Sequence, residues 1–103
     1  MVLVTSETII GKNCATLGLV SGNTVQSKNA IRDFGAGFKN LVGGELSAYT
    51  EMMGEARAIA TQRMIDQAEQ MGADAIVAMR YLSTTISQQA AEVLAYGTAV
   101  KFI

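Results

Sequence analysis

The residues best suited to chemistry are a single thiol, Cys14, and a few charged side chains, in a chain that contains no histidine. The lack of histidine removes Ser–His and Cys–His nucleophile pairs, histidine acid–base catalysis and the commonest metal ligand. Proton transfer near neutral pH would then need a carboxylate, a lysine or a thiol with a perturbed pKa. Because no nucleophile–base pair can be named, the sequence predicts that the protein is not an enzyme.

Cys14 has two interpretations. Lone cysteines are among the most buried residue types and mostly contribute packing, which is what we expect here. The alternative is a functional thiol, if a ring brings several copies together or if one thiolate holds a soft ligand. A soft-metal site needs two or more thiolates or imidazoles. We therefore predict no cofactor and no tight zinc or copper site within one subunit, and Cys14 is the only candidate metal ligand.

Five charged residues lie within otherwise apolar stretches: Arg32, Asp33, Arg57, Asp74 and Arg80. Arginines that face a pocket or a ring channel could hold a carboxylate or phosphate group through paired hydrogen bonds. This makes Arg32, Asp33, Arg57 and Arg80 the candidate ligand-binding residues. The alternative, which we favour, is that these side chains form ion pairs between layers or between subunits.

A long amphipathic helix over residues 46–71 must organise these side chains. Apolar residues recur every three or four positions, at Tyr49, Met53, Ala56, Ala60, Met64, Ala68 and Met71. This spacing is the period of one helical face, and its alanines would let a packing partner approach closely. The methionines follow the same face, so core packing explains them without copper ligation. Gly72 suits the left-handed residue that ends many helices.

Strand-like segments flank the helix. Residues 15–25 form a predicted strand, in which Gly18 and Gly22 indicate a bulge or a close backbone approach. Residues 75–86 and 92–103 are expected to pair antiparallel, while residues 2–4 are only a candidate edge strand. A shorter helix with an apolar face is expected over residues 31–42, before the long one.

The predicted fold class is α+β, a two-layer subunit whose antiparallel sheet of about three strands is packed by one long and one shorter helix. The last predicted strand is apolar on both faces, one bearing Val93, Ala95, Gly97 and Ala99, the other Leu94, Tyr96, Val100 and Phe102. The long helix can cover only one face, whereas a half-exposed antiparallel strand would have a polar face. The second face therefore predicts a neighbouring subunit.

Composition sets further limits on the function. With 103 residues, of which 50% are hydrophobic and 17% charged, a single domain (1–103) carries more apolar side chains than one small core can bury. The net charge is -1, and the eight Lys and Arg residues are scattered rather than clustered, so nucleic-acid binding is not expected. No apolar run is long enough for a membrane span, and the first residues lack the positive region of a signal peptide. The lone cysteine fits a reducing compartment, so the expected location is cytoplasmic.

Several short motifs resemble, in order and spacing, the YbjQ-like family of small bacterial and archaeal proteins of unassigned function. They are Asn29-Ala-Ile31-Arg-Asp-Phe34-Gly-Ala-Gly37, Val42-Gly-Gly44, Tyr49, Ala56-Arg57, Gly72-Ala-Asp-Ala75 and Gly97-Thr-Ala-Val100. The resemblance implies a two-layer subunit with an antiparallel sheet and assembly into a pentameric ring. It also implies a heavy-metal-binding label, which no ligand set in this sequence supports.

Three hypotheses for the function follow, each from a different class. The first is an oligomeric binding or storage module for a small ligand or a metal ion. The second is a structural or partner-binding assembly without a ligand of its own. An enzyme comes third, because no catalytic set can be named.

Overall fold

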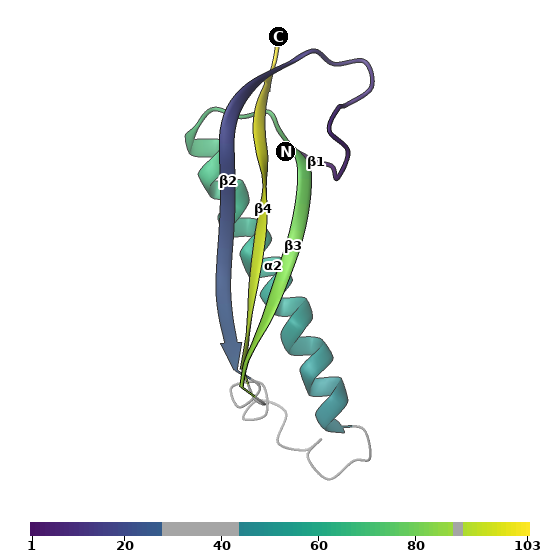
Figure 1. Cartoon of the computed structure of the whole chain (residues 1–103), viewed down its shortest axis with the longest axis vertical. Helices are drawn as coiled ribbons and strands as arrows, with labels where there is room; N and C mark the ends of the chain where they lie inside the picture. Colours follow the sequence, from purple (N-terminus) through teal and green to yellow (C-terminus); the bar gives the residue numbers. More distant parts are fainter. Residues whose placement is uncertain (28–43, 88–89) are drawn as a thin grey trace.

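The computed structural model describes residues 1–27, 44–87 and 90–103. Its elements follow the order β1 (Val2–Leu3), β2 (Cys14–Ser27), α2 (Gly44–Gln70), β3 (Ala75–Ser87) and β4 (Ala90–Phe102). The strands form one sheet in the order β1-β3-β4-β2, and α2 lies along one face of it (Figure 1). The α+β class, the long helix and the antiparallel pairing of the last two strands are confirmed.

Two features of the predicted sheet are wrong. The sheet has four strands rather than about three, and it is mixed, because β1 runs parallel to β3. β1 contributes only two residue pairs, Val2 with Ala75 and Leu3 with Ile76, so its pairing leaves almost no periodic signal in the sequence. The predicted shorter helix over residues 31–42 lies outside the described residues.

Helix α2 begins two residues before and ends one residue before the predicted bounds. Its buried stripe follows a strict four-residue spacing through Met52, Ala56, Ala60, Met64 and Ala68. The predicted stripe was right at its centre but not at its end, since Met71 is 39% exposed.

The helix stops at Gly72, as the sequence predicts. Gly72 adopts φ 79°, and its amide donates to the carbonyl of Glu69. The amide of Ala73 donates to the carbonyl of Ala68. These two bonds and the left-handed glycine constitute a Schellman motif, which satisfies carbonyls that the helix end would otherwise leave unpaired.

The two layers approach most closely where α2 crosses β2. A Cβ atom at Gly22 would lie 2.3 Å from the carbonyl oxygen of Ala60 and 2.4 Å from the amide nitrogen of Met64. The helix backbone therefore occupies the place of a side chain, which only glycine allows. Gly18 accounts for the other predicted irregularity, because the β2–β4 register shifts between Thr16 and Gly18.

The core lies between α2 and the sheet face that carries Val20, Ile76, Val93, Ala95 and Ala99. This confirms that one face of the last strand packs on the long helix. No helix in the described part of the chain is both long and apolar enough to cross a membrane.

The sheet face opposite α2, which we call the open face, is covered at one end only. Val100 is 3% exposed and packs with Ala75 and Val77 in a second, small cluster, which Phe102 flanks. The expectation that Val100 needs a neighbouring subunit for burial is therefore wrong, because Val4, Ile9 and Cys14 of the same chain pack against its cluster. Towards the other end, Leu19 and Leu82 remain 73% and 54% exposed.

Candidate functional site

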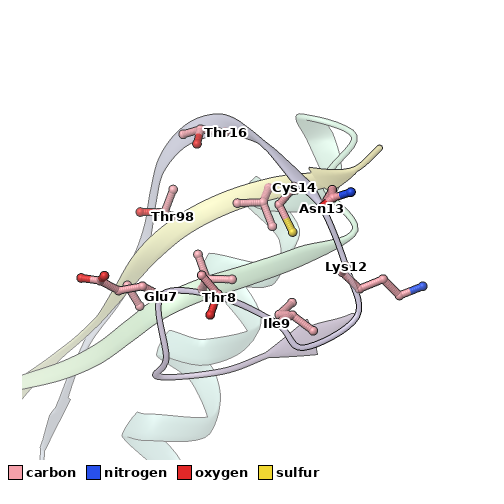
Figure 2. Close-up of a pocket in the computed structure, with 11 residues that line it drawn as sticks. Glu7, Thr8, Ile9, Lys12, Asn13, Cys14, Thr16 and Thr98 are labelled. Carbon is pink, nitrogen blue, oxygen red and sulfur yellow. The ribbon is translucent and has the colours of Figure 1, made fainter.

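Residues 5–13 connect β1 to β2 across the covered end of the open face, and we call this segment the roof loop (Figure 2). Two hydrogen bonds fix its first part to β3, and a third holds Val4, the residue that precedes it. The amide of Ala78 donates to the carbonyl of Ser6 (2.8 Å), the amide of Met79 to that of Val4 (3.1 Å), and Nη1 of Arg80 to that of Thr5 (2.8 Å). Because each bond ends on β3, the loop is held at a defined height above the sheet.

The second part of the roof loop is a tight turn. The amide of Lys12 donates to the carbonyl of Ile9, and Gly11 between them has φ 82°. A positive φ at the third residue of a β-turn is the requirement of a type II turn, which glycine meets without strain.

A cavity of about 540 Å³ lies between the roof loop and the sheet. The loop contributes five of its lining residues, and β2, β3 and β4 contribute the others. The lining consists of Glu7, Thr8, Ile9, Lys12, Asn13, Cys14, Thr16, Val77, Ala78, Thr98 and Val100.

The lining divides into a floor and a rim by exposure. We call the buried or half-buried lining residues the floor, and we count Ile9 among them although it belongs to the roof loop. None of them carries a formal charge: Ile9, Cys14, Val77, Ala78, Thr98 and Val100. The rim is exposed and polar, and it includes Glu7, Thr8, Lys12, Asn13 and Thr16. The cavity therefore has an apolar, uncharged floor and a charged edge.

Ala78 in the floor has a strained backbone. Its φ of 53° lies in the left-handed region, which costs an L-residue other than glycine roughly 1–2 kcal/mol. The strain accompanies a bulge, because the β3–β4 register shifts between Val77 and Arg80. The bulge turns the amide of Ala78 towards Ser6, so the irregularity that deforms the floor also holds the roof.

The two charged side chains of the rim do not converge. Figure 2 shows Glu7 and Lys12 at opposite ends of the lining, with their charged groups directed away from each other. The Lys12 ammonium lies 5.0 Å from the centre of the Phe102 ring, a distance at which the ring attracts a cation. Lys12 is therefore engaged outside the cavity, and Glu7 is in contact with water.

Two floor residues offer polar atoms. Cys14 is a free, half-buried thiol, and its sulfur points towards the part of the loop that carries Ile9 (Figure 2). Thr98 is half-buried, and within the described chain its hydroxyl makes no hydrogen bond to another residue. These are the groups that a molecule inside the cavity would meet beside the valines.

The structure does not bring the predicted ligand-binding residues together. Arg57 is exposed on α2, on the other side of the sheet from the cavity. Arg80 donates to the carbonyls of Thr5 and Met79, so its guanidinium positions the roof loop. Arg32 and Asp33 lie outside the described residues.

The remaining embedded carboxylate, Asp74, also has a structural partner. Its Oδ2 accepts a hydrogen bond of 2.8 Å from the amide of Phe102, and Nζ of Lys101 lies 3.9 Å from the same oxygen. These contacts tie the start of β3 to the end of β4. The contacts join neighbours within one sheet, so they are not the ion pairs between layers or subunits that we favoured from the sequence.

Sequence reasoning missed the cavity, although it singled out Cys14. The roof loop has no periodicity, and a run of Thr, Ser and Glu after a short strand is typical of any polar connection. Val100 was assigned to a strand face for which the expected partner was a neighbouring subunit. No local signal indicates that residues 5–13 fold over residues some seventy positions later.

The donor set of the site bears on metal binding. Within residues 1–27, 44–87 and 90–103, no three His, Cys, Asp or Glu side chains converge where they could hold a metal ion. Cys14 is the only thiol of the whole chain. One thiolate does not make a soft-metal site, so the residues of a single subunit do not fit such an ion.

Comparisons with known proteins find similarity along the whole chain. A family model described as "Putative heavy-metal-binding" matches residues 1–103. A UPF0145 protein of Clostridium novyi is 55% identical over 103 residues and covers 100% of both chains. A UPF0145 protein of Pseudothermotoga lettingae is 58% identical over 102 residues, which cover 98% of this chain and 96% of the relative.

The fold is also seen in solved structures. One of them is a crystal structure of a protein of unknown function from Pediococcus pentosaceus, assigned to the DUF74 family, with a TM-score of 0.64 and 15% identity over 100% of this chain and 98% of that one. At this identity the likeness extends to the fold alone. Because the family model and the relatives both span the full sequence, this chain belongs to the YbjQ-like family.

Proposed function

We propose that the protein binds a small ligand in the cavity beneath the roof loop, without catalysing a reaction. The observation that carries this proposal is the cavity itself. Its volume of about 540 Å³ lies within the range of about 300–1,000 Å³ that is usual for small-molecule sites. An apolar floor with a few polar groups is the usual lining of such sites.

The roof loop supports the proposal because it is positioned before any ligand arrives. Its hydrogen bonds to Ala78 and Arg80 involve main-chain carbonyls of the loop, so they do not depend on a ligand. A preformed site loses less conformational entropy when it binds than a loop that must first become ordered.

The absence of histidine from the whole sequence supports binding rather than catalysis. The floor offers a lone thiol and a threonine hydroxyl, and the only carboxylate of the described lining is Glu7, an exposed residue of the rim. The single cysteine supports a cytoplasmic location, which we include in the proposal.

Filling the cavity tests the proposal. Thr98→Phe would place a ring above Val77 and Val100, whereas Thr84→Phe adds the same ring to an exposed position of β3 that does not line the cavity. Both variants and the parent chain are screened by thermal unfolding against a library of metabolites. A ligand at 100 times its Kd adds about 2.7 kcal/mol to the stability, so a true ligand shifts the Tm clearly.

We expect at least one compound to stabilise the parent chain and the Thr84→Phe variant but not the Thr98→Phe variant. Compounds that stabilise all three proteins equally would place binding elsewhere and contradict the proposal.

A second function, assembly with other copies of the chain, is supported by the uncovered part of the open face. Leu82 and Leu94 lie opposite each other in the β3–β4 ladder, and Leu19 and Val25 extend the apolar surface onto β2. Leu19, Val25 and Leu82 are each more than half exposed in the single chain. We propose that a neighbouring subunit covers them, in a homo-oligomer for which the YbjQ-like resemblance suggests five copies.

A further inference from the structure

We propose that the ligand of the cavity is an uncharged organic molecule with an apolar body and a hydrogen-bonding group, and that the cavity does not hold a heavy-metal ion. This inference rests on the proposed function and specifies its ligand. It disagrees with the description attached to the family model.

The soft-metal donors of the chain are too few for the ion that the family description names. The sequence contains one cysteine and no histidine, whereas structural zinc sites use four such ligands and catalytic ones three. Thiols from two subunits would be needed to reach even two donors. The Cys14 sulfur points towards the roof loop of its own chain rather than away from the cavity (Figure 2).

The charges of the lining also argue against an ionic ligand. All six floor residues are uncharged, and burying an ion there would remove it from water without an opposite charge to compensate. The two charged rim residues lie at opposite ends and point apart (Figure 2), and the Lys12 ammonium already lies over the Phe102 ring. A neutral molecule avoids this desolvation penalty.

The floor offers complementary contacts to a neutral, amphiphilic molecule. Val77 and Val100 line the cavity from within a small apolar cluster that they form with Ala75, so an apolar body would contact them there. Beside them, the Thr98 hydroxyl has no hydrogen-bond partner in the described chain. A ligand hydroxyl or carbonyl would pair with Thr98, and this one directional contact would fix the orientation of the apolar body.

Three probes of one shape and different charge test the ligand class: 2-naphthalenemethanol, 2-naphthoate and 2-naphthylmethylammonium. Each is titrated into the full chain while the methyl signals of Val77 and Val100 are followed by nuclear magnetic resonance. We expect the alcohol to shift both residues and to bind at least about tenfold more tightly than either ion, which is a difference of 1.4 kcal/mol.

Matched variants assign the contacts. Thr98→Val keeps the shape of the side chain but removes the hydroxyl. We therefore expect the affinity for 2-naphthalenemethanol to fall several-fold, whereas the affinity for naphthalene itself stays unchanged. Thr98→Phe should abolish the shifts of Val77 and Val100, and Thr84→Phe should leave them intact.

Cadmium is the probe for the metal hypothesis. In equilibrium dialysis we expect no stoichiometric cadmium site of submicromolar affinity. One cadmium per chain that shifts Val100 and is lost in Cys14→Ser would overturn the inference and place a metal in the cavity.

The outcomes separate this inference from the proposed function. If an ion binds as tightly as the alcohol and Thr98→Phe still blocks it, the cavity is a ligand site but the ligand class is wrong. If no probe shifts Val77 or Val100, or if binding persists in Thr98→Phe, the proposed ligand site is wrong as well.

Discussion

At the scale of single residues, glycines determine how closely the two layers of the molecule approach. Gly22 is the clearest case, because the backbone of α2 occupies the position that a Cβ atom would need. A glycine within a strand otherwise destabilises the fold, because it loses more conformational entropy on folding than other residues and offers no side chain for packing. Its presence here marks the point where the helix touches the sheet backbone.

Gly22→Ala should therefore destabilise the protein severely. The new methyl group would meet main-chain atoms of Ala60 and Met64, which cannot rotate away as a side chain could. We expect a loss at the upper end of overpacking effects, about 3 kcal/mol or more. Urea denaturation of the variant and of the parent chain measures the difference.

Gly54→Ala is the matched control for that experiment. The nearest atom to a new methyl group there is Nη2 of Arg57 at 3.8 Å, an ordinary contact. Alanine in a helix interior is favoured over glycine by about 1 kcal/mol, so this variant should gain stability. Equal effects of the two substitutions would show that the close approach at Gly22 does not exist.

At the scale of elements, α2 protects one edge of the sheet as well as covering its face. Oε1 of Gln67 accepts a hydrogen bond of 2.7 Å from the amide of Ser21, and Nη1 of Arg63 donates one of 2.7 Å to the carbonyl of Asn23. β2 is the last strand of the sheet, so these main-chain groups have no strand partner. Side chains of the helix take the place of a further strand, which would otherwise be a route to aggregation.

Replacing Gln67 by Ala should expose this edge. The lost hydrogen bond is solvent-accessible, so we expect only about 1 kcal/mol of destabilisation in thermal unfolding. We also expect faster growth of thioflavin-positive aggregates on prolonged incubation, because the Ser21 amide becomes available to another chain. Gln62→Ala is the control, since Gln62 bonds only Asp66 on the same helix. Aggregation of both variants at one rate would contradict an edge-protecting role.

The elements themselves were largely predictable from the sequence. The helix period, the C-terminal Gly72 and the two-faced last strand are local patterns, and each predicted its element within a few residues. The glycines of β2 were also informative, since Gly18 marks a bulge and Gly22 a close approach.

The site was not predictable for a physical reason. The hydrogen bond from the amide of Ala78 to the carbonyl of Ser6 joins residues far apart in the sequence, and neither residue type predicts it. The roof loop has no period, and its role follows only from the parallel pairing of β1 with β3, two residues long. A cavity is a property of such long-range contacts, whereas a motif is a property of neighbouring residues.

At the scale of the whole molecule, the roof loop divides the open face into two parts with different expected roles. The covered end holds Val100 in a core cluster and leaves room for the cavity. The uncovered part exposes Leu19, Val25 and Leu82, and a polar pair lies among them, with Nδ2 of Asn23 donating to Oε2 of Glu92 at 3.0 Å. An apolar surface with an internally satisfied polar pair is suited to contact another protein surface.

The uncovered part, rather than Val100 or Phe102, is thus the place to test assembly. Leu82→Asp should convert the oligomer to smaller species, because burying a leucine contributes about 1.5–3 kcal/mol and a buried unpaired carboxylate reverses that gain. The single chain tolerates the change, since Leu82 is already 54% exposed.

Ala58→Asp, on the solvent side of α2, adds the same charge and should leave the assembly intact. Light scattering coupled to gel filtration measures the mass, and melting at several concentrations shows whether folding and assembly are linked. A parent chain that elutes as a monomer with a concentration-independent melt would refute the proposed oligomer.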